Sequence, residues 1–236
     1  MPTQVNQFAQ PIGDPVPGWS PRPAPTGVIL EGVHCRLEPL DAARHADDLY
    51  ASFRSAPDGR DWTYLFVGPF ESLEDYRRFA DGAARSTDPR HYAVIDRRNG
   101  GAVGTLALMR QDPTHGVIEV GNVMFSSLLQ RTPLSTEAQF LLMRYVFGQL
   151  GYRRYEWKCD SLNAPSRKTA ERLGFRFEGI FRQAVVYKGR NRDTAWYAIV
   201  ESEWPPLEAA FQAWLSTENF DEQGRQRRSL SEFRAG

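Results

Sequence analysis

The residues with the clearest chemical potential stand where a polar run meets a long apolar-periodic segment, in the sequence Gln130-Arg131-Thr132-Pro133-Leu134-Ser135-Thr136-Glu137. Thr132 has the side chain of an N-cap residue, and Pro133 suits the first helical position because it has no N–H to leave unpaired. The N–H groups of Leu134, Ser135 and Thr136 would then project together from the positive end of the helix dipole. Such a helix start can bind a phosphate group, although a Thr-Pro before an apolar run is by itself more often only a well-capped helix.

A carboxylate stands inside a largely apolar strand pattern a little earlier in the chain, where Glu119 interrupts the run Val117–Phe125. A carboxylate in this setting can take a proton from a substrate as a general base, or it can be a charge at a sheet edge. Neither cysteine, Cys35 or Cys159, has the context of a nucleophile, and neither belongs to a metal-ligand or disulfide spacing. We therefore expect no metal site and no covalent enzyme intermediate.

The composition is that of a globular protein with a substantial core. The chain has 236 residues, 41% of them hydrophobic, which is enough for one large domain or two small ones. Lysine plus arginine equals aspartate plus glutamate at 29 each, so no net field draws the chain to nucleic acid or to an anionic membrane. No signal-like segment opens the sequence, and no run reaches the roughly 18 apolar residues of a membrane span. We expect a cytoplasmic protein without a nucleic-acid or membrane partner.

Three regions differ in composition. Residues 1–27 are rich in proline, which disfavours regular structure and predicts an extended arm, either disordered or anchored by its few large apolar side chains. Residues 28–204 carry the alternating periodicities of one α/β domain. Residues 205–236 open with two prolines that would end a strand, and continue as a short helix and a polar tail.

Hydrophobic periodicity predicts the elements of the central domain in order. The expected strands are residues 33–37, 92–95, 103–109, 117–125 and 155–159, one starting at residue 175, and a final hairpin of residues 183–187 with 194–200. The expected helices are residues 41–53, 72–84, 133–150, 163–173 and 207–215. An Asn-Gly turn at residues 99–100 joins the second and third strands as a hairpin. This order predicts an α/β (α+β) fold without internal repeats.

Two motifs carry a resemblance to a known family. The run from Gln130 to Ser135 lies in the register of Gln/Arg-x-x-Gly-x-Gly/Ala, with Pro133 and Ser135 replacing the small residues. The second motif, Asn-x-x-Ser followed by Gly-Phe, matches residues 163–175. The chain therefore resembles the GNAT superfamily of acyl-CoA N-acetyltransferases, and within it the ribosomal-protein alanine N-acetyltransferase branch. The resemblance implies a single mixed sheet of about seven strands, flanked by helices and splayed between strands four and five.

The resemblance also implies acetyl-CoA as the cofactor and names the residues that would contact it. These are Met124, Phe125, Gln130, Arg131, Thr132, Pro133, Leu134, Ser135, Thr136, Asn163, Ser166, Lys168 and Arg172. The helix start would hold the pyrophosphate, and the end of strand four would offer its main chain to the pantetheine arm. Lys168 and Arg172 would reach the adenosine 3′-phosphate, unless they are simply solvated cations.

Acetyl transfer to an amine requires a proton acceptor, stabilisation of a developing oxyanion and protonation of the departing thiolate. Glu119 resembles the strand-four glutamate of this branch and is the candidate base, acting directly or through water. Ser166 is the candidate proton donor, or only a hydrogen-bond partner of the sulfur. Many GNAT enzymes have a tyrosine where this chain has Ala170, so the general acid is left open. A non-catalytic acyl-CoA-binding or regulatory module is therefore the alternative function.

By the same resemblance the acceptor site lies between the first two helices and the last hairpin. The candidate residues are Asp61, Trp62, Tyr64, Tyr187, Arg190, Asp193 and Trp196. Aromatic walls with carboxylates suit a cationic amine, although such aromatics serve equally as packing residues. The expected acceptor is a primary amine, of a small molecule or of a protein N-terminus, and the expected assembly is a monomer or homodimer. The proline-rich arm is a candidate lid over this opening.

Overall fold

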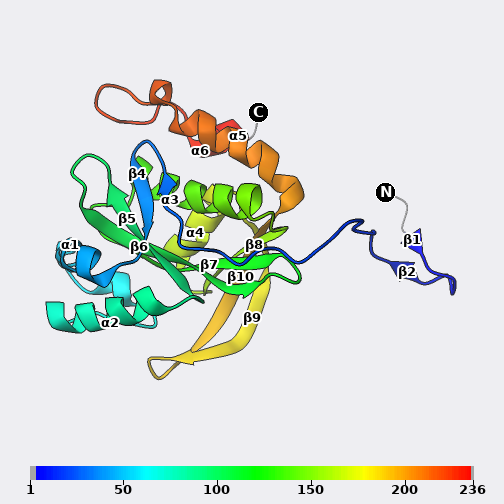
Figure 1. Cartoon of the computed structure of the whole chain (residues 1–236), viewed down its shortest axis with the longest axis horizontal. Helices are drawn as coiled ribbons and strands as arrows, with labels where there is room; N and C mark the ends of the chain where they lie inside the picture. Colours follow the sequence, from blue (N-terminus) through cyan, green and yellow to red (C-terminus); the bar gives the residue numbers. More distant parts are fainter. Residues whose placement is uncertain (1–3, 235–236) are drawn as a thin grey trace.

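The computed structural model describes residues 4–234, which contain an eight-stranded sheet with helices on both faces (Figure 1). Its strands are β3 (Leu30–Glu31), β4 (Cys35–Pro39), β5 (Arg90–Asp96), β6 (Ala102–Asp112), β7 (Val117–Phe125), β8 (Arg154–Asp160), β9 (Arg176–Tyr187) and β10 (Arg190–Val200). They follow the order β3-β4-β5-β6-β7-β8-β10-β9, and the sheet is antiparallel except where β7 meets β8. The predicted fold class is confirmed. The sheet has eight strands instead of about seven because the short β3 extends one edge.

The helices form two groups, which cover opposite faces of the sheet. One group is α1 (Ala42–Arg54) and α2 (Leu73–Arg85), and the other is α3 (Pro133–Arg144), α4 (Ala164–Leu173), α5 (Trp204–Leu215) and the short α6 (Leu230–Arg234). Alternating side chains of β5 show the division, because Tyr92 and Val94 join the core beneath α3 whereas Ala93 and Ile95 join the core beneath α1 and α2. Within residues 4–234, no helix combines the length and apolar character that crossing a bilayer requires.

Local signals in the sequence account for most helix boundaries. Asp41 caps α1 by accepting a hydrogen bond from the N–H of Ala43 at 2.9 Å, and the Ser72 hydroxyl caps α2 in the same way. The helix that starts at Pro133 ends with a π-helical turn, Tyr145–Gln149, close to its predicted end. The prediction that two prolines end a strand is wrong. Both lie in the first turn of α5, where proline is tolerated because those N–H groups have no helical partner.

The sheet opens between β7 and β8. The two strands pair in parallel over only four residues each, and their pairing stops after Val120 and Trp157. Just beyond this point the register of β7 against β6 shifts, and Asn122 has a left-handed backbone with φ of 48°. Such a bulge bends a strand, so β7 turns away from β8 while both strands keep their outer partners. The predicted splay between strands four and five is thereby confirmed.

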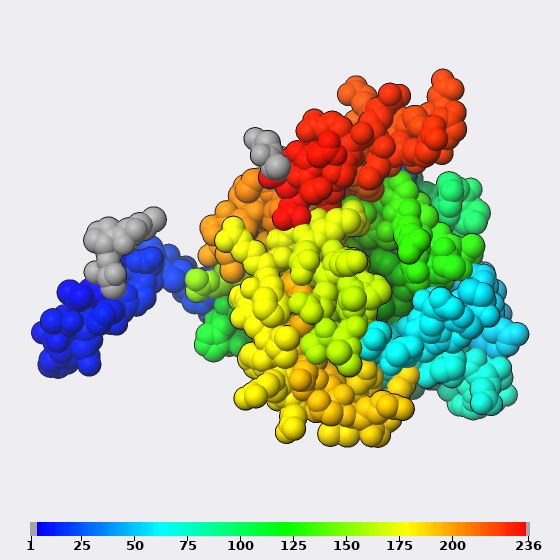
Figure 2. All heavy atoms as spheres, turned by 180° about the vertical axis from the view of Figure 1, so that it is seen from behind, coloured from blue at the N-terminus to red at the C-terminus, as the bar shows by residue number. Residues whose placement is uncertain are grey.

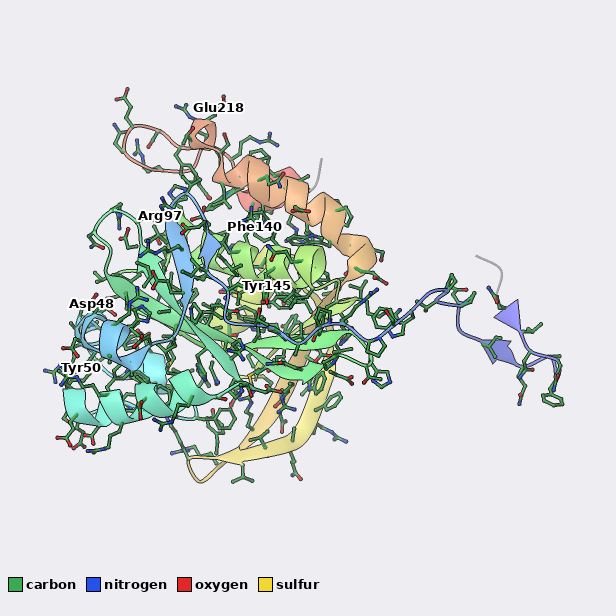
Figure 3. All side chains as sticks on the ribbon, in the orientation of Figure 1. Asp48, Tyr50, Arg97, Phe140, Tyr145 and Glu218 are labelled. Atoms are coloured by element: carbon green, nitrogen blue, oxygen red, sulfur yellow. The ribbon has the colours of Figure 1, made fainter. Side chains whose placement is uncertain are left out.

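A buried carboxylate fixes the position of α3 against this sheet. Glu137, 3% exposed, accepts hydrogen bonds at 2.7 Å from the backbone N–H groups of Val33, His34 and Cys35. Hydrogen bonds to an ionised carboxylate are shorter and stronger than neutral ones. Three of them tie the first turns of α3 to the loop between β3 and β4, which holds the start of the helix in place beside the open strands. Farther along α3, Phe140, which is labelled in Figure 3, stacks on Phe211 of α5.

The N-terminal arm is anchored to the domain and contains a short element that the sequence did not predict. β1 (Gln4–Val5) and β2 (Pro11–Ile12) form an antiparallel pair, which tolerates proline because each strand needs few ladder bonds. Farther along, the Trp19 indole donates to the Thr114 carbonyl at 2.9 Å. Figure 2 shows the arm projecting from one side of the molecule, with α1 and α2 on the other side.

The polar tail after α5 folds back on the domain. Asn219, 5% exposed, donates to the Trp214 carbonyl at 3.0 Å, and Leu230 of α6 is fully buried. Arg234 donates from Nη1 to the carbonyls of Glu171 and Arg172, which lie at the C-terminal end of α4. This contact satisfies helix-end carbonyls and complements the negative end of the helix dipole. The short helix α6 therefore lies against the C-terminal end of α4.

Candidate functional site

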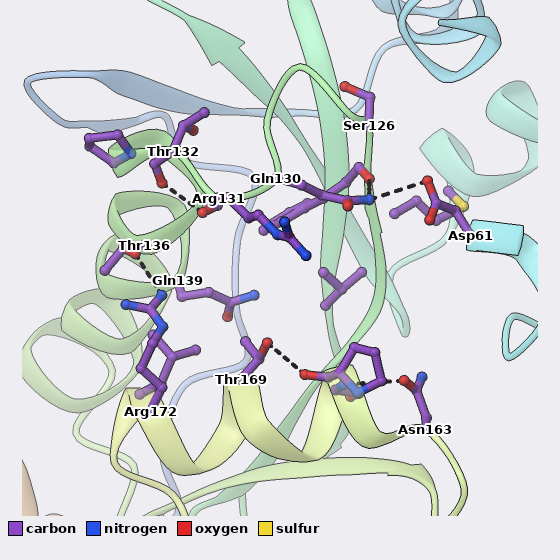
Figure 4. Close-up of a pocket in the computed structure, with 18 of the residues that line it drawn as sticks. Asp61, Ser126, Gln130, Arg131, Thr132, Thr136, Gln139, Asn163, Thr169 and Arg172 are labelled. Atoms are coloured by element: carbon purple, nitrogen blue, oxygen red, sulfur yellow. Dashed lines mark hydrogen bonds between the residues drawn. The ribbon is translucent and has the colours of Figure 1, made fainter. Parts of the chain in front are cut away.

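A cavity of about 1240 Å³ lies where β7 and β8 separate, between the start of α3 and α4 (Figure 4). The predicted site residues that line it are Asp61, Trp62, Tyr64, Met124, Phe125, Gln130, Arg131, Thr132, Pro133, Ser135, Thr136, Asn163, Ser166 and Arg172. The predicted residues that do not line it are Glu119, Leu134, Lys168, Tyr187, Arg190, Asp193 and Trp196. No residue of the described part of the arm lines it either, so the structure does not support the arm as its lid.

The start of α3 lies at this cavity, but its hydrogen bonds differ from those expected. Thr132 occupies the N-cap position, yet its hydroxyl donates to the Leu129 carbonyl at 2.7 Å instead of capping the helix. The N–H and the hydroxyl of Ser135 both donate to the Thr132 carbonyl, at 3.2 and 2.7 Å. This tighter i+3 bond occupies the Ser135 amide. The expectation that three neighbouring amides all face outward is therefore wrong for Ser135, and the Leu134 side chain is buried in the core.

Two arginines give the cavity a positive lining. Arg131 has a left-handed backbone with φ of 60°, an unfavourable conformation for a residue other than glycine. Its side chain points into the cavity (Figure 4), and Arg172 reaches in from α4, where its Nη2 donates to the Thr136 hydroxyl at 2.8 Å. Neither arginine takes part in an ion pair with a carboxylate of residues 4–234. Guanidinium groups without a carboxylate partner favour a phosphorylated ligand.

The start of α4 presents a hydroxyl to the same cavity. Asn163 caps this helix as predicted, because its Oδ1 accepts the N–H of Ser166 at 3.1 Å. The Ser166 Oγ accepts a hydrogen bond from the Trp157 indole at 3.0 Å. The indole has a donor only, so this hydrogen bond does not use the hydroxyl proton of Ser166. Ala170, in the position of the family tyrosine, is fully buried in the core.

Glu119 lies on the face of the sheet opposite the cavity. In β7 it comes one residue before Val120, which forms the last residue pair with β8. Its carboxylate is 2.9 Å from the Lys158 Nζ and 3.3 Å from the Arg110 Nε. Lys158 also contacts Glu156 at 2.8 Å and lies 3.7 Å from the centroid of the Trp196 ring. Because side chains alternate along β8, Lys158 points away from the face that carries Trp157 and the cavity. We call Glu119, Glu156 and Lys158 the carboxylate cluster.

The environment of Glu119 sets its proton affinity. Burial raises the pKa of the Glu119 carboxyl above its ordinary value, although Lys158 and Arg110 act in the opposite direction. The neighbouring Glu156 carboxylate adds to the increase. A carboxylate with a raised pKa accepts a proton more readily near neutral pH than an ordinary one. The Glu119 carboxylate thus lies on one face of the sheet, and the Ser166 hydroxyl lines the cavity on the other face.

The predicted acceptor residues lie in two groups. Asp61, Trp62 and Tyr64 line the cavity, and Gln130 donates from Nε2 to Asp61 Oδ2 at 3.3 Å and to the Phe125 carbonyl at 2.8 Å. This contact joins the segment between α1 and α2 to the end of β7.

The second group belongs to the β9–β10 hairpin and lies outside the cavity. Tyr187 donates to Asp160 Oδ2 at 2.8 Å, and Asp193 lines a separate shallow depression of about 620 Å³. Trp196 stacks on Phe181 with ring centroids 4.3 Å apart. The two groups are nevertheless neighbours, because Lys188 at the hairpin turn donates to the Trp62 carbonyl at 2.7 Å.

Sequence reasoning missed several residues of the cavity wall. Gln139 lies one helical turn after Thr136 on α3, and it was hidden among apolar positions of that helix. Trp157 comes from a strand position that carries no motif, and Thr169 is a position within the second motif whose residue type the motif does not specify. Trp214 and Arg225 belong to the C-terminal residues, and no local sequence pattern predicts that this segment folds back to the cavity. The available signal was the one-turn spacing from Thr136 to Gln139, which puts both side chains on one helix face.

Known proteins share this sequence and fold. A family model described as an acetyltransferase (GNAT) domain matches residues 34–176. The crystal structure of a GCN5-related N-acetyltransferase from Brucella melitensis is 52% identical, with a TM-score of 0.92, over 94% of this chain and 100% of that chain. YdaF of Bacillus subtilis (strain 168), provisionally named a ribosomal N-acetyltransferase, is 25% identical over 71% of this chain and 90% of its own length.

A ribosomal-protein enzyme shares the fold at lower identity. RimL, the ribosomal L7/L12 alpha-N-protein acetyltransferase, solved in complex with coenzyme A, is 19% identical with a TM-score of 0.60, over 75% of this chain and 99% of that chain. The predicted resemblance to the superfamily is thereby confirmed, and the similarity to YdaF agrees with the predicted resemblance to the ribosomal-protein branch. The chain therefore belongs to the GNAT acetyltransferase superfamily and is an acyltransferase.

Proposed function

We propose that this protein transfers an acetyl group from acetyl-CoA to a primary amine, of a small molecule or of a protein N-terminus, within a ternary complex. The observation that carries the proposal is the cavity, which extends from Arg131 and Arg172, two arginines without a carboxylate partner in residues 4–234, to the point where β7 and β8 separate. A long ligand with phosphates at one end and a reactive carbonyl at the other fits such a cavity. Acetyl-CoA supplies that carbonyl as an activated thioester.

The chain offers a distinct group for each part of this cofactor. Arg131 and the positive end of the α3 dipole would hold the diphosphate. Among residues 4–234, the inner edge of β7 at Met124 and Phe125 has no partner strand. Apart from the Phe125 carbonyl, which accepts a hydrogen bond from Gln130, its main chain is free to pair with the amides of the pantetheine arm. A backbone N–H of this edge would stabilise negative charge on the thioester oxygen as the amine attacks.

The chemistry then needs one proton to leave the amine and one to reach the sulfur. Glu119 would accept the amine proton, directly or through water, as the new C–N bond forms and the C–S bond breaks. Ser166 would hydrogen-bond the departing thiolate or protonate it, and solvent would then restore the serine proton. Direct transfer agrees with the cysteines, because burial raises the pKa of the thiols of Cys35 and Cys159 and keeps both as poor nucleophiles.

A non-catalytic acyl-CoA-binding module is the alternative function. Two observations favour it, namely the buried Ala170 in place of the family tyrosine and the Ser135 amide that is occupied by Thr132. The decisive experiment measures thiol release from acetyl-CoA with a panel of primary amines and N-terminal peptides. Amine-dependent thiol release supports the acetyltransferase. Tight binding of acetyl-CoA with no thiol release in the presence of any amine of the panel supports the binding module.

Substituting Ser135→Asp tests the position of the diphosphate. We expect the dissociation constant for acetyl-CoA to rise about tenfold or more, because the new carboxylate repels the phosphates. An acidic residue in the first turn of a helix is favourable, so thermal stability should not fall. Calorimetric titration and a melting curve check both statements, with Ser135→Ala as the neutral control. An unchanged affinity in Ser135→Asp contradicts a diphosphate at this helix start.

A further inference from the structure

The cavity has a wall that lies outside the matched family domain. The family model ends at residue 176, yet Trp214, Phe220, Arg225 and Gln226 line the same cavity as the helix start. We call residues 214–226 the C-terminal wall. It stands beside the C-terminal half of α4, where Arg172 projects into the cavity.

The C-terminal wall is held in a defined conformation. The Trp214 indole donates to Gln226 Oε1 at 2.9 Å, and the Phe220 ring meets the indole edge-on with centroids 5.3 Å apart. The buried Asn219 closes the intervening loop, because its Oδ1 accepts the N–H of Arg228 at 3.0 Å. Side chains of this wall are therefore positioned before a ligand arrives, which lowers the entropic cost of binding.

A buried carboxamide opposite this wall lacks partners. Gln139 is 1% exposed, and neither its Oε1 nor its Nε2 has a hydrogen-bond partner among residues 4–234. Burying an unpaired amide is unfavourable, and its side chain is directed into the cavity beside Thr136 and Arg172 (Figure 4). A ligand in the cavity that offers both a donor and an acceptor would satisfy it.

The chemistry of this end of the cavity suits a phosphorylated nucleoside. The Arg172 guanidinium lies 6.0 Å from the Trp214 ring centroid and has no carboxylate partner in the described chain. Arg225 reaches the cavity from the wall with its side chain largely exposed, and its Nε is 2.9 Å from Asp221. Guanidinium groups recognise phosphates, aromatic rings pack against bases, and a carboxamide can pair with the polar edge of a purine.

We propose that the C-terminal wall, together with Gln139, binds the 3′-phosphorylated nucleoside end of the acyl carrier. This inference rests on the proposed function, which puts the thioester at the strand separation and the diphosphate at the start of α3. The connectivity of acetyl-CoA then sends its nucleoside beyond the diphosphate, toward Arg172 and the wall. The C-terminal residues thus act as a second part of the cofactor site, contributed by a segment outside the family domain.

The test uses two fragments of the cofactor with the full-length protein. Adenosine 3′,5′-bisphosphate carries the nucleoside end alone, and S-acetylpantetheine carries the thioester end alone. We expect Gln139→Leu and Arg225→Ala each to weaken binding of the bisphosphate about tenfold, and to raise the KM for acetyl-CoA more than the KM for S-acetylpantetheine. Arg227→Ala is the matched control, because this neighbouring arginine does not line the cavity and should leave both values unchanged.

Stability measurements separate a lost contact from a damaged fold. Gln139→Leu replaces an unpaired buried amide by an apolar group of similar size, so the melting temperature should stay the same or rise. Bisphosphate affinities in both variants equal to that of the wild-type protein would overturn the inference while acetyl transfer by the wild type continued. A wild-type protein that neither binds acetyl-CoA nor releases thiol would instead refute the proposed function, and the inference with it.

Discussion

Glu119→Gln is expected to lower kcat at pH 7 by about a hundredfold to a thousandfold, the range typical of a lost general base. The amide has nearly the shape of the carboxylate but cannot take a proton from the acceptor amine. Folding should survive, because Lys158 keeps its second carboxylate, Glu156, at 2.8 Å. The affinity for acetyl-CoA should also survive, since Glu119 lies on the face of the sheet opposite the cavity. Ground-state binding and proton transfer are separable quantities.

The pH dependence supplies the sharper part of this test. An α-amine has a reference pKa of about 8, so at higher pH solvent removes its proton and the enzyme base matters less. The difference in kcat/KM between wild type and Glu119→Gln should therefore narrow between pH 7 and pH 9.5. Steady-state rates across this range and a calorimetric titration with acetyl-CoA provide the measurements. A pH-independent difference, or equal losses of turnover and cofactor affinity, speaks against Glu119 as the base.

Lys158→Met should shift the acid side of the pH–rate profile to higher pH. The Lys158 ammonium lowers the pKa of Glu119, so its removal raises that pKa further above the ordinary value. The base must be deprotonated to act, and a higher pKa means that it becomes protonated, and inactive, at a higher pH. The variant should also lose stability, because the two buried carboxylates lose the buried cation that they share and keep only Arg110 and Arg154 as partners in the described chain.

Glu156→Gln is the companion variant, and its expected effect has the opposite sign. The Glu156 carboxylate raises the pKa of Glu119, so neutralising it lowers that pKa and moves the acid limb to lower pH. Profiles of kcat/KM against pH for both variants, with denaturant unfolding of each, give the readouts. If the acid limbs of the two variants move in the same direction, or if neither moves, the carboxylate cluster does not control the pKa of the proton acceptor. The comparison also holds when Lys158→Met is too unstable at low pH, because Glu156→Gln retains the cation.

Much of the fold follows from short-range patterns. Val117–Phe125 is a strand with the predicted bounds, and α1 and α2 begin at the capping residues that the sequence provides. These boundaries were predictable because an N-cap and an alternating strand act within a few residues of one another. The short strand β3 was missed because its two residues carry too little periodicity to detect. The arm was predicted to lack regular structure, but Pro11–Ile12 forms a strand. A two-residue strand needs few backbone N–H donors, so it can include a proline.

The site was predictable only where one segment carries the whole motif. Residues 130–136 and 163–166 read as helix starts, and both line the cavity. The state of the Ser135 amide was not predictable, because residue types do not record whether an N–H in the first helical turn stays unpaired or forms an i+3 bond. The roles of Glu119, Ser166 and the acceptor residues stay predictions, for which the experiments above provide the test.

The sequence by itself determined the superfamily, the order of strands and helices, and the two polar helix starts, because each depends on residues close together in the chain. Tertiary structure alone decided the pairing of Glu119 with Lys158, the unpaired amide of Gln139, and the return of residues 214–226 to the cavity. Those features join residues from distant elements, where burial and charge depend on how the sheet and helices pack. Hydrophobic periodicity records which face of an element is buried, but it does not record which distant side chain that face meets.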